Sequence, residues 1–330
     1  MNDNLVSVKN VSVEFDYQEN FLSKKQKIQA VKNVSLNIKK KSFLGLVGES
    51  GSGKTTLGKA ILGANKISEG QVIFHDDDID YDLANINKKE LREYRKKAQL
   101  IFQDPYAALS PRMTVRDIIA EPLEVMKITK SREETDERVR DIASKCRLNL
   151  EHLRRYPHAF SGGQRQRISI ARSLVSYPKF IVADESVAAL DVSIQADILN
   201  LLKSLQKDLD LTYLFISHDL SVVAHTCDEV AVMYLGHIVE QAPSRELFTN
   251  PRHPYTKALL SSIPSIDPDD QKKAIELKGE IPSAMNPPSG CVFRTRCPNP
   301  THECKEGHIE MGLIEISPNH WVDQCCINCG

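Results

Sequence analysis

The chain has 330 residues, more than the roughly 100–200 of a usual single domain, so its length predicts a main globular domain with an appendage. With 41% apolar and 26% charged residues, its composition excludes a disordered chain, a collagen and a disulfide-rich miniprotein. A formal charge of −1 argues against nucleic acid as the main partner. The apolar runs fall short of the roughly 20 residues that span a bilayer, and Met1–Asn10 lacks a basic-then-apolar leader, so we expect a cytosolic chain.

Three short apolar runs predict buried strands, namely Phe43–Val47, Phe180–Ala183 and Tyr213–Ser217. Between the last two, apolar residues from Ile194 to Leu209 repeat at helical spacing. A strand, a helix and a second strand in this order predict a parallel sheet. Ligands of such sheets bind at the carboxyl ends of the strands, where each of these runs stops at polar or glycine residues.

The first strand ends in a complete phosphate-loop pattern, Gly48-Glu49-Ser50-Gly51-Ser52-Gly53-Lys54-Thr55. Its glycines permit a turn that points backbone N–H groups at one anion, and the following helix adds the positive end of its dipole. Lys54 supplies a positive charge to the β- and γ-phosphates, and the Thr55 hydroxyl can ligate Mg²⁺. We expect this loop, with Thr56, to bind a nucleotide; the alternative is a glycine-rich turn that binds nothing.

The second strand ends in adjacent carboxylates. Asp184 is the acid expected to hold Mg²⁺ through water in a phosphate-loop NTPase. Glu185 can orient and polarise the water that attacks the γ-phosphate. The alternative is that the two carboxylates cap the turn that follows.

A second anion site is predicted at Ser161-Gly162-Gly163-Gln164, which opens a predicted helix. Ser161 and Gln164 have the spacing of a capping box, which is the alternative interpretation. The two glycines cost helix stability but let an anion approach the helix N-terminus. Because this segment has no lysine and lies far from the phosphate loop in sequence, it suggests a site for another subunit's nucleotide.

The composition along the chain predicts two further regions. From Asp104 to Tyr177 the pattern is helical, which predicts a helical subdomain at about 105–176 inserted in an ATPase domain of residues 1–250. Prolines become dense after Asn250, so residues 251–330 are expected to hold a short helix near Tyr255–Ile263, a linker and a tail. Most of the eight cysteines lie in that tail: Cys291, Cys297, Cys304, Cys325, Cys326 and Cys329. Their spacing leaves unliganded thiols and zinc open, because only the last two have an ordinary zinc spacing.

At this point the sequence resembles the ATP-binding subunits of ABC transporters, and more closely the oligopeptide, dipeptide and nickel importer branch. Besides the phosphate loop, the resemblance rests on FQDP around Gln103, FSGGQRQR at Phe160–Arg167, IVADE at Ile181–Glu185, ALD ending at Asp191 and ISHDLS around His218. The branch rests on VMYLGHIVEQ, NPRHPYTKALLSSIP and GCVFRTRC. The fold that it implies is an α/β phosphate-loop NTPase core with a parallel sheet, an inserted helical subdomain and a cysteine-rich C-terminal extension.

The resemblance implies a head-to-tail dimer of cassettes, in which two ATP molecules lie between the phosphate loop of one and the Ser161–Gln164 segment of the other. Gln103 would touch Mg²⁺ and the attacking water, and His218 would contact the γ-phosphate and hold Glu185 and Asp191. Phe15 resembles the aromatic residue that stacks on adenine. The alternatives are that Tyr17 does so, or that Phe15 belongs to a strand core.

The implied function is ATP hydrolysis that energises import of oligopeptides or dipeptides. The implied partners are a second and different ATPase subunit, two transmembrane permease subunits and, indirectly, an extracellular solute-binding protein, with the chain at the cytoplasmic face of the membrane. Nickel as the cargo, a homodimer, and a soluble ABC ATPase acting on DNA or ribosomes are the alternatives. One departure from the family is Ser186, where proline usually follows the catalytic glutamate, so the loop to Asp191 is expected to be looser.

The resemblance also bears on the tail, because members of this branch can carry a [4Fe–4S] cluster there. It implies Cys291, Cys297, Cys304 and Cys325 as ligands, with Cys326 as the alternative fourth. Zinc and free thiols remain the other two possibilities. ATP hydrolysis needs no electron transfer, so such a cluster would be structural or redox-sensing.

Overall fold

The computed structural model describes residues 3–18, 26–77, 79–188, 190–263, 275–277, 279–309 and 311–327, with the backbone alone at Pro105, Cys326 and Ile327. Ala189 and Cys329, and the side chain of Cys326, lie outside this description. The chain forms two compact units, each made of separate segments. The first holds Met1–Leu5, Ile38–Phe43 and Phe74–Ile216, and the second holds Val6–Asn37, Leu44–Ile73 and Ser217–Gly330.

The first unit contains three parallel strands in the order β8-β7-β6, which are Thr212–Ile216, Phe180–Asp184 and Ala98–Ile101. Every residue of β7 and β8 is buried, as their continuous apolar runs predict. Helix α7 (Val192–Leu209) connects them and buries one apolar stripe from Ile198 to Leu205. The predicted strand, helix and strand are therefore confirmed, within one residue at each strand end.

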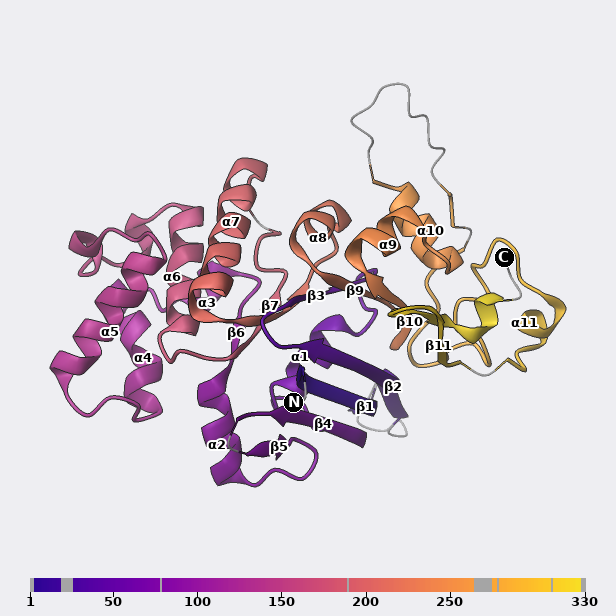
Figure 1. The fold of residues 1–330 in the computed structure, drawn as a ribbon, viewed down its shortest axis with the longest axis horizontal. Coiled ribbons are helices and arrows are strands. Elements are labelled where there is room, and N and C mark those ends of the chain that lie inside the picture. The colour runs from indigo at the N-terminus through magenta and orange to yellow at the C-terminus, as the bar shows by residue number, and fades with distance from the viewer. Residues whose placement is uncertain are drawn as a thin grey trace. The chain divides into compact units, whose positions relative to one another are not determined.

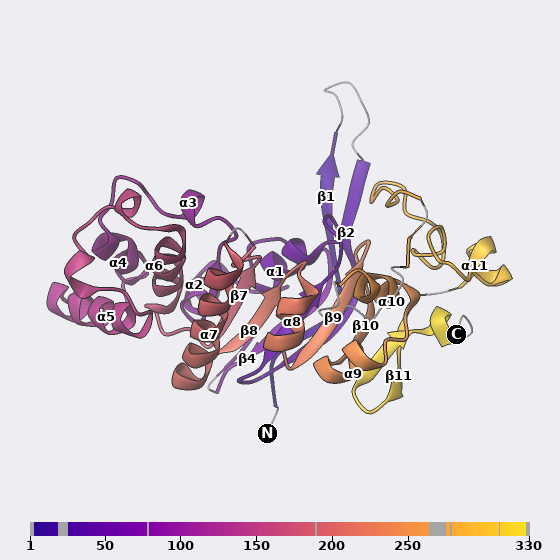
Figure 2. The same cartoon turned by 90° about the horizontal axis from the view of Figure 1, so that it is seen from above.

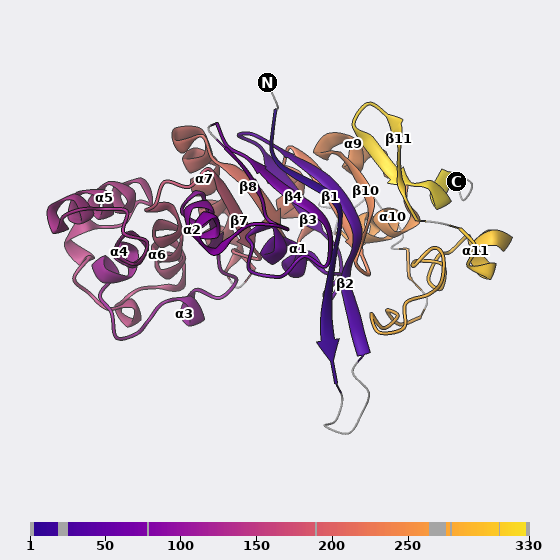
Figure 3. The ribbon, with the colours of Figure 1, turned by 90° about the horizontal axis from the view of Figure 1, so that it is seen from below.

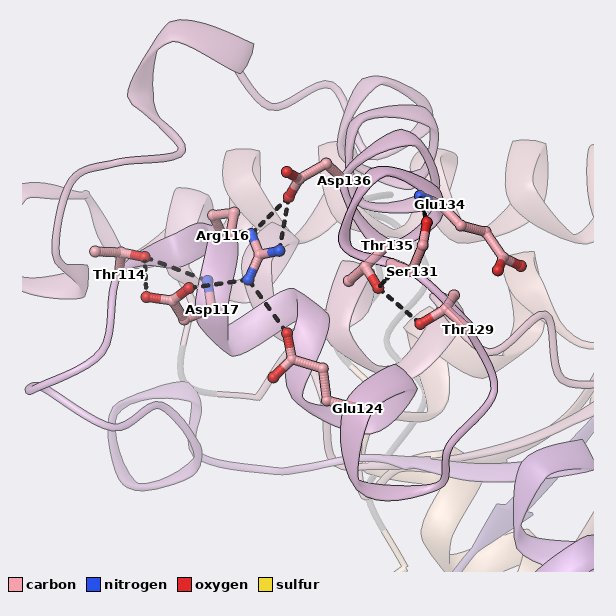
Figure 4. Close-up of polar contacts among 9 residues, drawn as sticks. All are labelled: Thr114, Arg116, Asp117, Glu124, Thr129, Ser131, Glu134, Thr135 and Asp136. Atoms are coloured by element: carbon pink, nitrogen blue, oxygen red, sulfur yellow. Dashed lines mark hydrogen bonds and ion pairs between the residues drawn. The ribbon is translucent and has the colours of Figure 1, made fainter.

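The helical part of the first unit lies between β6 and β7. Its α-helices are α3 (Pro105–Ala108), α4 (Val115–Val125), α5 (Arg132–Lys145) and α6 (Gly162–Leu174), and two short 3-10 helices lie at Leu150–His152 and Pro157–Ala159. Helices α5 and α6 both pack on α4 (Figure 1). Arg116 of α4 adds a polar tie to α5, because its guanidinium pairs with Asp136 at 2.7 Å and also with Glu124 at 3.3 Å (Figure 4). Helix α2 (Lys88–Lys97) and strand β5 (Asp80–Asp82) complete this unit.

The second unit contains a sheet in the order β11-β12-β10-β9-β3. These strands are Leu313–Ser317, His320–Asp323, His237–Pro243, Glu229–Tyr234 and Phe43–Val47. Strands β3 and β9 are parallel, but β10 runs antiparallel to β9 and to β12. The sheet of this unit is therefore mixed, and the prediction of a parallel sheet holds for β3 and β9 but not for β10, β11 and β12. The cause is a hairpin whose two turn residues, Leu235 and Gly236, both have positive φ, as a tight turn between antiparallel strands requires.

A second layer of strands in this unit has the order β2-β1-β4, with β1 at Asn4–Tyr17, β2 at Gln26–Lys39 and β4 at Glu69–His75 (Figure 3). Helix α1 (Lys54–Ile61) follows β3 directly. Helix α9 (Ser244–Thr249) packs on β9 and β10 (Figure 2). The remaining helices are α8 (Leu220–Thr226), α10 (Pro254–Ser261) and α11 (His302–Glu306). In the described part of the chain, no helix has the length and apolar character that crossing a bilayer requires.

Candidate nucleotide site

The predicted phosphate loop lies in the second unit, between the buried strand β3 and helix α1. Gly48 and Gly53 have φ of 151° and 105°, respectively, which residues with a side chain rarely adopt. A Cβ on Gly48 would lie 2.1 Å from the carbonyl oxygen of Met233, and one on Gly53 would lie 2.3 Å from that of Ala30. Both positions therefore require glycine. Gly53 caps α1 without a side-chain hydrogen bond, so the amide groups that begin α1 face the loop rather than a capping side chain.

Lys54 is the first residue of α1, and its side chain folds back into the loop. It is only 5% exposed, and its Nζ donates to the carbonyl oxygens of Gly48 and Glu49, each at 2.8 Å. A buried ammonium needs a partner of opposite charge or several acceptors. A phosphate at this loop would supply that charge, which makes the lysine suited to the β- and γ-phosphates of a nucleotide.

The predicted catalytic residues Gln103 and Glu185 meet in the first unit, although 82 positions separate them. Gln103 Nε2 donates to Glu185 Oε2 at 2.8 Å. The Glu185 backbone has φ of 46°, a left-handed conformation that costs about 1–2 kcal/mol in a residue with a side chain. Its N–H group donates to the carbonyl of Ile216 on β8, which holds that conformation at the strand end. Strained, well-held residues of this kind cluster at functional sites.

Asp184 and Asp191 flank this carboxylate along the chain. Asp184 ends β7 and is 8% exposed. Asp191 is the N-cap residue of α7 but makes no side-chain capping bond. Ser186 is buried, and its hydroxyl has no hydrogen-bond partner among the described residues. The hydroxyl that replaces the family's proline therefore adds no bond to this turn.

The Ser161–Gln164 segment also lies in the first unit, at the start of α6. The capping box that we gave as the alternative is present, because Ser161 Oγ accepts from Gln164 N at 3.4 Å and Gln164 Oε1 accepts from Ser161 N at 3.1 Å. The glycines between them differ in their surroundings. A Cβ on Gly162 would lie 3.7 Å from Leu190, whereas one on Gly163 would lie 2.7 Å from Ile194 Cγ2. Packing against α7 is therefore a reason for the second glycine that the sequence did not reveal.

The other predicted nucleotide contacts lie in the second unit. Phe15 and Tyr17 of β1 are 42% and 40% exposed, so the alternative that Phe15 is a strand core residue is wrong. Either ring is available for stacking on a base. His218 is exposed just before α8, which is capped by the side chain of Asp219.

Two residues near the phosphate loop were not predicted as part of the site. Tyr255 of α10 and Arg296 both contact Glu49, the second residue of the loop. Both fall in stretches that supported the branch resemblance, but nothing in their spacing connects them with residue 49. Only the fold brings them together.

The tail cysteines form a close pair rather than the predicted ligand set. Cys291 and Cys325 are buried, and their sulfur atoms are 3.4 Å apart. The hydrogen bond from Cys325, together with burial, raises the pKa of the Cys291 thiol, and burial raises the pKa of Cys297. Cys304 accepts a hydrogen bond from the Thr301 hydroxyl. Among the described residues no three of Cys, His, Asp or Glu are placed to hold a metal ion, so a four-cysteine site for a [4Fe–4S] cluster or zinc is not supported.

Comparison with known proteins gives one family match in the N-terminal part of the chain and a second one nearer its C-terminus. A family model described as "ABC transporter" matches residues 31–188, and one described as "Oligopeptide/dipeptide transporter, C-terminal region" matches residues 239–304. The chain is 48% identical over 320 residues to the putative oligopeptide transport ATP-binding protein YkfD of Bacillus subtilis (strain 168), covering 96% of this chain and 94% of that protein. It is 48% identical over 307 residues to the oligopeptide transport ATP-binding protein OppF of Salmonella typhimurium, covering 92% and 91%.

Solved structures of ATP-binding cassettes have a fold similar to that of this chain. A dimeric, post-hydrolysis structure of the ATP-binding cassette MJ0796 bound to ADP and Pi matches with a TM-score of 0.62 at 30% identity. That match covers 73% of this chain and 99% of the other, so the cassette accounts for about three quarters of the molecule.

Proposed function

Because the chain belongs to the ATP-binding subunits of ABC transporters, in the branch with an oligopeptide/dipeptide C-terminal region, we propose that it hydrolyses ATP to energise the import of oligopeptides or dipeptides. The contact between Gln103 and Glu185 is the observation that carries the hydrolytic part. The C-terminal match at residues 239–304, and the names of YkfD and OppF as oligopeptide transport proteins, support a peptide as the cargo.

The proposed roles combine the geometry within each unit with what the family resemblance implies. The loop from Gly48 to Thr56 binds the phosphates of ATP, with Lys54 as the counter-charge. Thr55, Gln103 and Asp184 have the oxygen atoms that would hold Mg²⁺, an ion that neutralises charge on the phosphates when bound. Glu185 orients the attacking water, and the amide of Gln103 fixes the direction of that carboxylate. His218 is proposed to contact the γ-phosphate and to hold Glu185 and Asp191, as the family resemblance implies.

The assembly proposed for this chain is a pair of cassettes. The similar MJ0796 cassette is dimeric in its structure with ADP and Pi, which supports an arrangement of two nucleotides that each meet a phosphate loop and a partner's Ser161–Gln164 segment. Phe15 would stack on adenine.

As a transporter subunit, the chain would lie at the cytoplasmic face of a membrane, held by two permease subunits, and its partner cassette would be a related but different subunit. Residues 1–250 would be the ATPase domain and 251–330 the extension.

Two substitutions test the hydrolytic role. Glu185→Gln should retain ATP binding and lower kcat by at least about 100-fold, because the water loses its oriented base. Lys54→Ala should lose ATP binding itself. Glu137→Gln on α5 removes an exposed carboxylate elsewhere and serves as the control. Wild-type hydrolysis by Glu185→Gln would refute the assignment. In the assembled transporter, uptake of labelled tripeptide, dipeptide and nickel then tests the cargo separately.

A metal site in the tail is not part of this proposal, because the described residues do not fit one. Anaerobic purification followed by iron, sulfide and zinc analysis decides among a cluster, zinc and free thiols. A metal-free protein with titratable tail thiols would reject both metals.

A further inference from the structure

Glu49 of the phosphate loop is held by a residue 247 positions away in the chain. Arg296 donates to its carboxylate through both terminal nitrogens, from Nη1 to Oε2 at 2.7 Å and from Nη2 to Oε1 at 3.1 Å. The side chain of Arg296 is 7% exposed and that of Glu49 is 26% exposed. A bidentate, largely buried pair of this kind is both directional and stronger than a surface ion pair. The Glu49 carboxylate also raises the pKa of Arg296, which keeps the guanidinium charged.

The backbone of Glu49 is held from the same region. Its N–H group donates to the hydroxyl of Tyr255 at 2.8 Å, and Tyr255 is fully buried on α10. The N–H group is thus engaged by protein and the carboxylate by Arg296. Both contacts come from the C-terminal region, and both lie within the second compact unit.

Aromatic packing fixes the position of Arg296. The rings of Tyr234, Tyr255 and Phe293 form a cluster with centroid distances of 4.7, 5.3 and 5.5 Å. The Arg296 guanidinium lies 5.9 Å from the centre of the Tyr234 ring, and its backbone N–H donates to the carbonyl of Phe293. Tyr234 ends β9, and the turn after it donates from Gly236 N to Ser52 O of the phosphate loop at 2.9 Å. The loop is therefore braced at residue 49 by the C-terminal region and at residue 52 by the β9–β10 hairpin.

A carboxylate within an anion-binding loop presents an electrostatic problem. ATP carries several negative charges, which a free Glu49 carboxylate would repel. That carboxylate could also accept hydrogen bonds from the loop N–H groups that the phosphates need. We propose that Arg296 is a positioning residue for ATP binding: it neutralises Glu49 and fixes the loop in the conformation that receives the triphosphate. This inference rests on ATP binding at the loop, and not on the nature of the cargo.

The direct test measures ATP affinity of the full-length chain by titration calorimetry, and KM and kcat in the assembled transporter. Arg296→Ala should weaken ATP binding and raise KM by about tenfold, the equivalent of one charged hydrogen-bonding contact, with kcat within about twofold of wild type. Adding Glu49→Gln to Arg296→Ala should restore most of the affinity, because it removes the unpaired charge. Arg294→Ala is the matched control, since Arg294 lies two residues away and donates instead to the carbonyl of Lys305 within the tail.

Three outcomes would overturn the proposal: unchanged ATP affinity in Arg296→Ala, a loss that Glu49→Gln does not relieve, or an equal loss in Arg294→Ala. The last two would indicate that the tail is needed only for folding. If Arg296→Ala does not fold, Arg296→Lys replaces it, because lysine keeps the charge but not the two-pronged contact. It should raise KM by about threefold, and Glu49→Gln should again relieve the effect. Failure of the ATPase assignment would appear differently, as absent ATP binding by the wild-type chain.

Discussion

Replacing Gly163 by alanine tests how the start of α6 is built. The new methyl group would lie 2.7 Å from Ile194 Cγ2 of α7, closer than two carbon atoms approach without movement. Gly162 is one position earlier in the same helix, and its Cβ would lie 3.7 Å from Leu190 Cδ2, an ordinary contact. The two substitutions make the same chemical change in the same turn, so their difference isolates the packing against α7.

The magnitude follows from two opposing contributions. Alanine in place of glycine in a helix stabilises by about 0.5–1 kcal/mol through the unfolded chain and helix propensity. Forcing a methyl group into occupied space costs about 1–3 kcal/mol. Gly162→Ala should therefore raise the free energy of unfolding by up to about 1 kcal/mol, whereas Gly163→Ala should lower it by up to about 2.5 kcal/mol.

Urea unfolding followed by circular dichroism measures both changes on the full-length chain. Ile194→Ala removes the methyl that would clash, so in the Gly163→Ala background it should be less destabilising than alone, with a coupling of about 1 kcal/mol. If Gly163→Ala proved as stable as Gly162→Ala, the contact between α6 and α7 would not determine the second glycine. The requirement for glycine there would then have to come from anion approach alone.

Two further predictions concern buried polar groups, and three substitutions test them. Ser186→Ala should leave the free energy of unfolding unchanged or raise it by up to about 1 kcal/mol, because it removes a buried hydroxyl that has no partner among the described residues. Ser173→Ala should lower the free energy of unfolding by about 1 kcal/mol, because Ser173 Oγ donates to Leu100 O at 2.8 Å. Equal losses of the two variants in urea unfolding would contradict this. Burial lowers the pKa of His253 to about 3, so the unfolded chain binds the proton first as pH falls below about 6.5, and stability present above that pH is lost as pH falls toward 3. Between pH 7.5 and 5.5 this loss is on the order of 1 kcal/mol. His253→Asn, compared with wild type by urea unfolding at both pH values, should remove it.

The parts of the fold that could be predicted are those that depend on local sequence patterns. Continuous apolar runs predicted β3, β7 and β8, because a strand that is buried on both faces is apolar at every position. Helical spacing predicted α7, because a helix that is buried along one stripe is apolar at every third or fourth position. The phosphate loop was predictable since its geometry demands glycine at fixed positions, which the φ values at Gly48 and Gly53 bear out. The capping box at Ser161 was also a local pattern.

The parts that could not be predicted depend on pairing between distant segments. The hairpin of β9 and β10 turns through Leu235-Gly236, and leucine is an unusual residue at positive φ, so the turn lacked the asparagine or aspartate that normally announces it. The contact between Glu49 and Arg296 spans 247 positions, and no spacing rule connects them. The cysteines show the reverse case, in which a dense local pattern suggested a ligand set that the described residues do not assemble.

The domain boundary that we predicted near residue 250 does not coincide with a division between the two compact units. Residues 44–73, which carry the phosphate loop, belong to the same compact unit as residues 217–330. Tyr255 and Arg296 lie beyond the boundary, yet both hold Glu49. Truncating the extension would leave the loop's carboxylate without its partner, so loss of ATP binding in a truncated chain would not distinguish a regulatory tail from a structural one. Point substitutions at Arg296, with Arg294 as control, therefore separate what a truncation confounds.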